Sequence, residues 1–178
     1  MNIDKRDIVI RRIENIDLKH IECIEADVNP EDQLIVEEMN PMFNAASDIV
    51  EYNGHVAEYG GLVVGYIISF KIVAISSISA VIRCVVDEDY RRCGVGSLLL
   101  DTVDPQTEGH KVSIECKEDN YGSMKFLKSA GYVVTQCNES EYDEDGEVDF
   151  DGYFVLTKEK REPMTLKNRL AMYPYYGE

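Results

Sequence analysis

Two arginines and two glycines stand close together in the segment Arg91-Arg92-Cys93-Gly94-Val95-Gly96. Glycine allows the oxygens of a ligand to approach the backbone, and arginine supplies formal positive charge. The apolar residues after this turn predict a helix, whose first N–H groups have no intrahelical partner and carry partial positive charge. This combination favours a site for a phosphate or a pyrophosphate.

The spacing of these residues narrows the choice of phosphate ligand. A dinucleotide-binding turn has a third glycine where this chain has Leu99, and a P-loop has a lysine before the residue that is Ser97 here. Glu115 lies about as far downstream as the ribose-binding acid of dinucleotide sites, but acidic residues are frequent in this chain. The R-x-x-G-x-G spacing of residues 91–96 resembles the acyl-CoA pyrophosphate loop of the GNAT N-acetyltransferase superfamily. Taken alone, the motif is also compatible with a glycine turn between two core elements.

A second segment, residues 114–120 with the sequence Ile-Glu-Cys-Lys-Glu-Asp-Asn, resembles the Leu-Glu-Val-Arg-x-x-Asn segment of ribosomal-protein-type N-terminal acetyltransferases in the same superfamily. The resemblance implies that Glu115 is the general base and that Asn120 contacts the arm of the cofactor. An ammonium acceptor must lose a proton before it attacks a thioester, and a carboxylate takes that proton directly or through water. The alternative for Glu115 is a strand residue that faces solvent or pairs with a lysine.

The chain departs from the superfamily at one catalytic position. A tyrosine usually stands four residues before the glycine that ends the next helix, where it protonates the departing thiolate, but this chain has Leu127 there. Tyr121 and Tyr132 are nearby in sequence and are the substitute acids to consider. A thiolate is only mildly basic, so water can also protonate it. The loss of the tyrosine therefore predicts slower turnover or a substitute acid.

The resemblance also assigns residues to the cofactor. In GNAT enzymes the end of the strand before the loop pairs with the pantetheine amide, and a backbone N–H there polarises the thioester carbonyl, as an oxyanion hole does. Cys84 and Cys93 have no histidine nearby in sequence, and we interpret both as packing residues. The expected cofactor-binding residues are Cys84, Val85, Val86, Arg91, Arg92, Cys93, Gly94, Val95, Gly96, Ser97 and Asn120.

Several predicted elements lead up to the loop and continue beyond it. Residues 8–13 read as a strand, and Asp17 is a candidate N-cap for a helix with Ile21 and Ile24 inward and Glu22 and Glu25 outward. Asn29-Pro30 predicts the start of a second helix that runs to about Met39. Gly60-Gly61 predicts a hairpin turn between strands at 55–59 and 62–70. The later elements are strands at 81–86, 111–116, 132–137 and 153–157, with helices after the glycine loop and over 121–130.

This order predicts one α/β domain with a mixed sheet and a GNAT-like fold over residues 1–157. The predicted order is β-α-α-β-β-β-α-β-α-β-β, which is the GNAT order. Residues 158–178 form a C-terminal extension with Tyr173, Tyr175 and Tyr176, which favour a tail docked on the domain or a patch at an interface. A homodimer is one arrangement that would use such a patch.

The net charge of −16 is the most informative feature of the composition. It argues against nucleic acid, whose phosphates require a basic face, and it favours a cationic acceptor such as a polyamine or a basic peptide or protein amine. Solubility alone is the alternative explanation. Eight of the carboxylates lie between Glu139 and Asp151, in a predicted hairpin tip whose glycine spacing does not match a calcium loop.

The remaining patterns exclude several classes of site and location. The five cysteines are scattered without a metal-ligand spacing, so we expect reduced core cysteines, no metal and a cytoplasmic protein. We also expect no secretory signal at the N-terminus and no membrane partner, because apolar runs are too short to cross a bilayer. The sequence thus predicts an acetyl-CoA-dependent N-acetyltransferase that works by direct attack of a primary amine. The alternative is a GNAT-fold module that binds CoA or a protein with little catalysis.

Overall fold

The computed structural model describes residues 3–28, 49–75, 77–103, 110–142, 148–150 and 152–159. The α-helices in this part of the chain are α1 (Leu18–Ala26), α3 (Val95–Asp101) and α4 (Tyr121–Ser129). The strands are β1 (Ile8–Arg12), β2 (Val50–Tyr59), β3 (Leu62–Ile72), β4 (Ile78–Val86), β5 (Lys111–Lys117), β6 (Val133–Asn138), β7 (Glu141–Tyr142), β8 (Val148–Phe150) and β9 (Tyr153–Glu159). The predicted second helix and the end of the chain after residue 159 lie outside the described residues.

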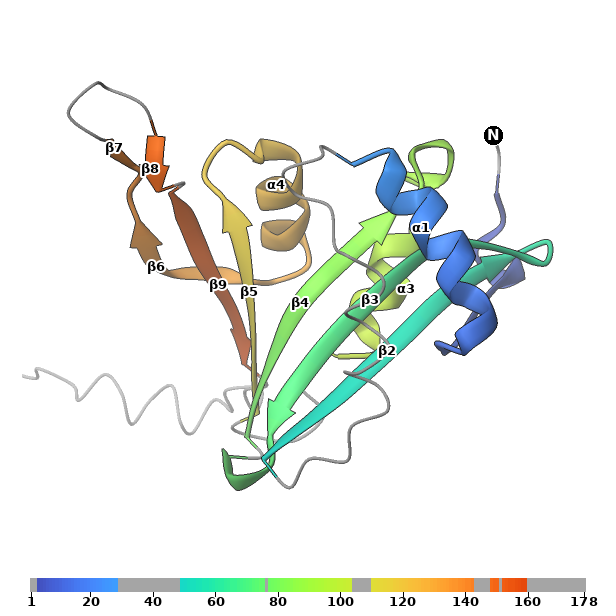
Figure 1. Cartoon of the computed structure of the whole chain (residues 1–178), viewed down its shortest axis with the longest axis horizontal. Helices are drawn as coiled ribbons and strands as arrows, with labels where there is room; N and C mark the ends of the chain where they lie inside the picture. The colour runs from blue at the N-terminus through green and yellow to red at the C-terminus, as the bar shows by residue number, and fades with distance from the viewer. Residues whose placement is uncertain are drawn as a thin grey trace, which may run out of the picture.

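Seven of these strands form one mixed sheet in the order β1-β2-β3-β4-β5-β9-β6 (Figure 1). Strands β4 and β5 run parallel, and every other neighbouring pair in this sheet is antiparallel. A separate two-stranded sheet, β7-β8, forms the base of the predicted acidic hairpin. The predicted α/β fold with a mixed sheet is confirmed.

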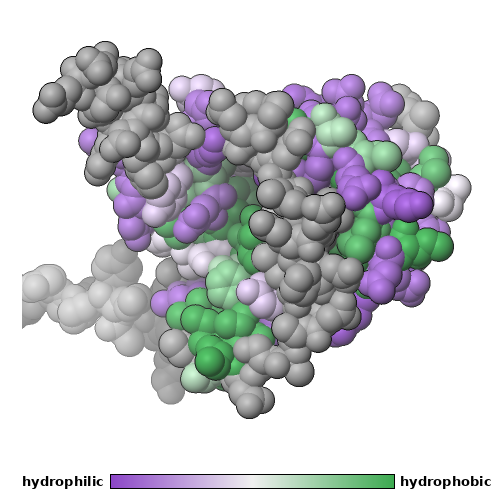
Figure 2. All heavy atoms as spheres, viewed as in Figure 1, coloured by the Kyte–Doolittle hydropathy of each residue, from purple (hydrophilic) through white to green (hydrophobic). Residues whose placement is uncertain are grey.

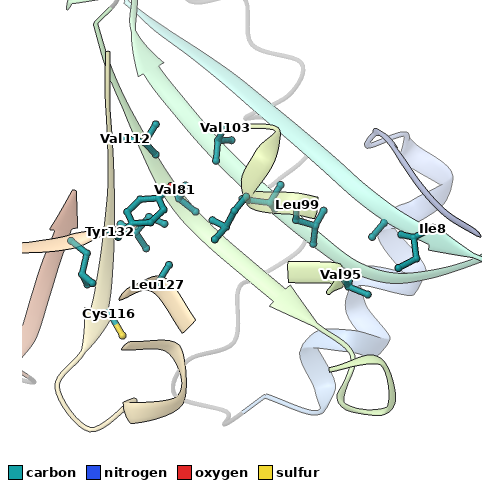
Figure 3. Close-up of a cluster of buried hydrophobic side chains, with 14 of the residues drawn as sticks. Ile8, Val81, Val95, Leu99, Val103, Val112, Cys116, Leu127 and Tyr132 are labelled. Atoms are coloured by element: carbon teal, nitrogen blue, oxygen red, sulfur yellow. The ribbon is translucent and has the colours of Figure 1, made fainter. Parts of the chain in front are cut away.

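Helices cover both faces of the large sheet (Figure 1). Ile21 and Ile24 of α1 pack in a cluster with Tyr66 and other side chains of β2 and β3. On the opposite face, α3 and α4 contribute to a larger cluster, which includes Leu99, Leu127 and side chains from β3, β4, β5 and β9 (Figure 3). We refer to the two sides of the sheet as the α1 face and the α3–α4 face.

The Gly60-Gly61 turn forms where the sequence predicts it, and a side-chain cap and a glycine bound α4. Gly60 and Gly61 have φ values of 60° and 82° in the turn between β2 and β3, a conformation that suits a two-residue hairpin. The Asn120 side chain caps α4 by accepting a hydrogen bond of 3.0 Å from the N–H of Ser123, and Gly131, with φ of 91°, follows the end of that helix. The predicted Gly60-Gly61 turn is confirmed, and a turn of this kind depends mainly on local backbone chemistry.

Two predictions around α1 are wrong. The Asp17 side chain makes no cap bond to α1; it accepts bonds from the guanidinium of Arg11 and from the N–H of Glu14. Glu25 was expected to face outward, but it is buried. Glu25 stands four residues after Ile21 and next to Ile24, so it shares the buried side of α1 with them. There its carboxylate bonds a hydroxyl and a guanidinium from the sheet.

Apolar side chains also gather at the end of the sheet where β3 ends and β4 begins (Figure 2). Val73 and Ile78 are large exposed hydrophobic residues of this region.

The predicted homodimer and the predicted division of the chain at residue 157 stay predictions. The last strand, β9, runs to Glu159, two residues beyond its predicted end.

Candidate active site

The two parallel strands of the sheet separate part-way along their length. Pairing between β4 and β5 runs from Ile78 opposite Lys111 to Val81 opposite Ile114 and ends there. The following residues of β4 still pair with β3, from Arg83 opposite Ile68 to Val86 opposite Gly65. The strands therefore form a fork that opens toward the end of β4 (Figure 1). In the fork, one edge of β4 has no neighbouring strand among the described residues.

Backbone alternation indicates which groups of β4 face the fork. The N–H of Asp87 donates to the carbonyl of Val64 on β3, with an N–O distance of 3.1 Å. Successive residues of a strand present their N–H and C=O groups to opposite edges. The N–H groups of Val86 and Cys84 therefore point into the fork, and that of Val85 points toward β3. Of the three predicted residues, Cys84 and Val86 have the backbone geometry to pair with a ligand in the fork.

The glycine loop directly follows this strand end. The Nε of Arg91 donates to the carbonyl oxygen of Val86 at 2.9 Å, which joins the loop to the open edge. Arg92 has a φ of 63° and Gly94 a φ of 91°, so the backbone turns sharply before α3 begins at Val95. Arg91, Arg92 and Ser97 are exposed, whereas Val95 is buried in the α3–α4 face. The loop thus presents cationic side chains and backbone N–H groups to solvent beside the fork.

Side chains fill the space where the two loop glycines would carry a Cβ. A Cβ on Gly94 would lie 2.2 Å from Cε and 2.7 Å from Nζ of Lys5, so the ammonium of Lys5 lies against the loop. A Cβ on Gly96 would lie 3.1 Å from Cζ of Phe126 on α4. The loop is therefore a close-fitting backbone cradle with an added cation. These features fit a pyrophosphate, which is bound by backbone N–H groups and positive charge.

Glu115 is the first residue of β5 beyond the fork point. Its neighbours Ile114 and Cys116 are buried in the cluster on the α3–α4 face. Side chains alternate along a strand, so Glu115 projects from the α1 face, and it is exposed. The Oδ1 of Asn120 is occupied by the cap of α4, which leaves its amide NH2 as the donor for a cofactor contact. Both roles stay predictions.

The cysteines near the fork are protonated side chains of the core. Burial raises the pKa of the Cys84 thiol to about 12, far above neutral pH, and Cys84 packs against the α3–α4 cluster. Burial also raises the pKa of Cys116. A thiol must lose its proton to act as a nucleophile, so Cys84 is unsuited to carry an acyl group. The described residues contain no group of histidines, cysteines and carboxylates that could hold a metal ion.

The comparison with known families decides the class of protein. The profile of the acetyltransferase (GNAT) family matches residues 20–132, more than half of the chain. This chain belongs to the GNAT family. The predicted family and the predicted enzyme class, N-acetyltransferase, are confirmed, and acetyl-CoA is the donor that this family uses. No curated protein matches the sequence.

Solved structures share the GNAT fold at low sequence identity. The ribosomal-protein-S18-alanine N-acetyltransferase of Escherichia coli superposes with a TM-score of 0.68 at 16% identity, over 89% of this chain and 98% of that one. Ard1 of Thermoplasma volcanium gives 0.63 at 22% identity, over 88% and 99%. Naa50 of Arabidopsis thaliana, in complex with the bisubstrate analogue CoA-Ac-MVNAL, gives 0.67 at 16% identity, over 86% and 99%. The predicted GNAT-like fold is confirmed.

The tyrosines near α4 of this GNAT protein occupy very different environments. Tyr121 is 78% exposed at the first turn of α4. Tyr132 is 2% exposed, and the ammonium of Lys158 lies 5.6 Å from the centre of its ring. Leu127 is buried in the same cluster as Tyr132 (Figure 3). The position of the usual acid is therefore an apolar contact, and a role for either tyrosine stays a prediction.

Sequence reasoning missed two features of this site. One is Lys5, which is far from the loop in sequence and reaches it only through the fold. The other is a buried ion pair between Glu25 of α1 and Arg83 of β4, at the fork. The only sequence signal for the pair is an arginine inside the apolar run of β4, which requires a partner if the strand is buried. Among the described residues, no helix is long and apolar enough to cross a membrane.

Proposed function

We propose that this GNAT protein transfers the acetyl group of acetyl-CoA to a primary amine that attacks the thioester directly at the fork. The observation that carries the proposal is the position of the glycine loop at the end of β4, directly after the unpaired edge of that strand. A ligand that binds the loop with its phosphates can extend along this edge. The donor then lies on the α3–α4 side, and the acceptor approaches from the α1 face.

Each end of the donor has matching groups on the chain. Lys5, Arg91, Arg92 and the backbone of residues 93–97 would hold the pyrophosphate. The open N–H of Val86 would bond the pantetheine arm, and the N–H of Cys84, deeper in the fork, would polarise the thioester carbonyl. The amide NH2 of Asn120 is available to the same arm. Bound acetyl-CoA supplies the activated acyl group.

Glu115 is the residue proposed to remove a proton from the attacking amine. It lies at the fork point and on the face from which the acceptor approaches. A primary ammonium is not a nucleophile, so proton transfer to the Glu115 carboxylate, directly or through a water, precedes attack. The thiolate that leaves takes its proton from water, because Leu127 places a hydrocarbon where the family usually has a hydroxyl.

The proposed acceptor is cationic, and a peptide or protein amine or a polyamine fits this description. The net charge of −16 supports it. Two proteins of the same fold support a peptide or protein amine, since one is a ribosomal-protein-S18-alanine N-acetyltransferase and another was solved with CoA-Ac-MVNAL. The test is release of free thiol from acetyl-CoA with and without a panel of amines. Amine-dependent release, with acetylated amine detected by mass spectrometry, is the expected result.

A second candidate function is a CoA- or protein-binding module with little catalysis. Burial of Leu127 favours it, because the described residues at this position offer packing instead of an acid. Tight binding of CoA without amine-dependent thiol release would support this function and would contradict transferase activity. The same pair of measurements, calorimetry and thiol release, therefore separates the two candidates.

A further inference from the structure

A β-bulge at the fork determines which way Arg83 points. The register between β3 and β4 shifts between Ile68, opposite Arg83, and Ser69, opposite Val81, so Ile82 is the extra residue. Val81 and Cys84 both pack toward the α3–α4 face, which would not occur in a regular strand. Val85 packs with the α1 cluster, and Arg83 points to the same face. Bulges re-aim side chains beside functional sites, and this one places an arginine on the acceptor side of the fork.

The buried carboxylate of Glu25 orients the guanidinium of Arg83, and the hydroxyl of Tyr66 in turn orients that carboxylate. Its Nε donates to Oε1 of Glu25 at 3.0 Å, and its Nη2 donates to Oε2 at 2.6 Å. The hydroxyl of Tyr66 donates to Oε1 of the same carboxylate. Burial and the neighbouring Glu25 carboxylate raise the pKa of Tyr66, so the phenol keeps the proton that it donates. Glu25 thereby fixes the plane of the guanidinium, which keeps its positive charge.

Arg83 is the member of this cluster that reaches the surface. Its side chain is 20% exposed, compared with 4% for that of Glu25, and Tyr66 is fully buried. A guanidinium carries five N–H groups in a rigid fork, and the two bonds to Glu25 use only Nε and Nη2. Among the described residues, Glu25 is the only carboxylate within 4.0 Å of this guanidinium. The bonds to Glu25 thus leave the Nη1 amino group of this partly exposed side chain for another acceptor.

Arg83 and Glu115 stand on opposite arms of the fork. Val81 is the last residue of β4 that pairs with β5, and Arg83 follows it after the bulge. Ile114 is the last residue of β5 that pairs with β4, and Glu115 follows it directly. Both side chains lie on the α1 face. An amine that reaches the fork from this face would meet a carboxylate on one side and a guanidinium on the other. The carboxylate can accept a hydrogen bond from the ammonium group, and the guanidinium can donate one to an oxygen atom next to that group.

We propose that Arg83 is a specificity-determining residue that binds a carbonyl or carboxylate oxygen next to the acceptor amine, so that the protein acetylates amines of the α-amino-acyl type, such as a peptide N-terminus. This inference rests on the proposed function. A polyamine has no oxygen acceptor, and its second cation would lie near the guanidinium of Arg83. In a peptide, the α-carbon that carries the free amine also carries a carbonyl group. The amine can therefore meet Glu115 while the carbonyl oxygen accepts a hydrogen bond from Arg83.

The experiment compares two acceptors with one donor. Acetyl transfer from acetyl-CoA is measured to a tetrapeptide with a free N-terminus and to spermidine, for the wild type and for Arg83→Met. The expected result is that the KM for the peptide rises about tenfold or more in Arg83→Met, because a charge-assisted hydrogen bond is lost. The KM for spermidine stays the same or falls. Arg83→Lys should recover part of the peptide KM, since it keeps the charge but not the fixed fork.

A matched control exists in the same chain. Arg11 also bonds both oxygens of a buried carboxylate, with distances of 2.7 and 2.8 Å to Asp17, but it lies on β1 at the far edge of the sheet. Arg11→Met should leave the ratio of the two KM values unchanged. If Arg83→Met does not fold, Glu25→Gln combined with Arg83→Met removes both charges and still gives Tyr66 an acceptor. The affinity for CoA, measured by calorimetry, should stay within about twofold in every variant.

Three outcomes would overturn the role of Arg83. These are equal changes for peptide and spermidine, an unchanged peptide KM, and a loss of CoA affinity that accounts for the whole effect. If the wild type binds CoA but transfers acetyl to neither acceptor, the proposed function has failed. Calorimetric binding of the peptide to the CoA-loaded protein then tests Arg83 by itself. Peptide binding that is weaker in Arg83→Met supports the inference, and equal binding contradicts it.

Discussion

Val81 and Ile114 form the last pair between the two parallel strands, and β4 and β5 separate directly beyond them. On one arm the N–H of Cys84 is open to the fork, and on the other arm Glu115 faces the opposite side of the sheet from the glycine loop. Under the proposed function, the fork would separate the donor, on the α3–α4 side, from Glu115, the proposed base. A single break in strand pairing would then position both groups.

Replacement of the candidate base should slow turnover with little effect on the cofactor. Glu115→Gln keeps the shape of the side chain but cannot take a proton, so we expect kcat to fall by ~10²–10⁴. The deficit should shrink at high pH, where more of the amine is already deprotonated. Steady-state rates between pH 7 and 10 test this, with Glu22→Gln on α1 as the control. Full activity of Glu115→Gln at neutral pH would return Glu115 to a structural role.

A negative charge at the glycine loop should weaken CoA binding without loss of the fold. Ser97 is exposed in the first turn of α3, so Ser97→Glu introduces a carboxylate where the helix dipole favours it. The same carboxylate repels a pyrophosphate, and the Kd for CoA should rise by roughly tenfold or more. Calorimetry measures the Kd, and Gln136→Glu on β6 controls for the added charge. An unchanged Kd would contradict the assignment of the loop to the pyrophosphate. Gly96 is a poorer test position, because any side chain there meets Phe126.

Much of this architecture was predictable because its signals are local. The strand end, the R-x-x-G-x-G turn and the following helix are contiguous in residues 81–101, and the predicted Gly60-Gly61 turn depends on two adjacent residues. Periodicity and turn chemistry report directly on such features.

The side chains on the acceptor side could not be predicted, because their directions depend on a β-bulge and on contacts between distant parts of the chain. The inward turn of Glu25 and the outward reach of Arg83 depend on one bulged residue, Ile82, and on contact between elements far apart in sequence. A shift of one residue in a strand changes the face of every later side chain, and no sequence pattern marks this bulge. Lys5 was not predicted for the same reason, because it contacts Gly94 only in the folded chain, where β1 packs beside α3.

The position of the missing acid allows a gain-of-function test. Leu127→Tyr restores the usual hydroxyl at α4, and we expect turnover either to rise or to stay the same. Leu127 is buried, so the larger ring can cost about 1–3 kcal/mol of stability through overpacking. Thermal unfolding and CoA affinity must therefore be measured beside the rate. A large loss of activity in a stable, CoA-binding variant would mean that position 127 has another role, such as shaping the acyl pocket.

Stability should decrease in mild acid because of His55 on β2. Among the described residues, its Nδ1 is buried without a hydrogen-bond partner, and burial together with nearby Arg12 lowers the pKa of this histidine below 6.5. The unfolded chain then binds a proton more readily than the folded one, so stability is complete above pH 6.5 and declines as the pH falls toward the folded pKa. Urea midpoints at several pH values between 7.5 and 5 test this. His55→Gln should reduce the slope of stability against pH.

The charge of the acceptor can be tested through ionic strength. The net charge of −16 and the eight carboxylates between Glu139 and Asp151 predict attraction of a cationic amine. CoA is itself anionic, so this negative charge is expected to lie away from the loop that carries Arg91 and Arg92. Attraction between separated charges acts mainly on encounter and is screened beyond about 8 Å at physiological salt. We therefore expect the KM for the amine to rise steeply with salt, while kcat stays nearly constant.

Replacement of Asp143, Glu144 and Asp145 by Asn, Gln and Asn should raise the KM at low salt in the same way. If KM is independent of salt, or if a neutral amine is the best acceptor, the charge serves solubility alone.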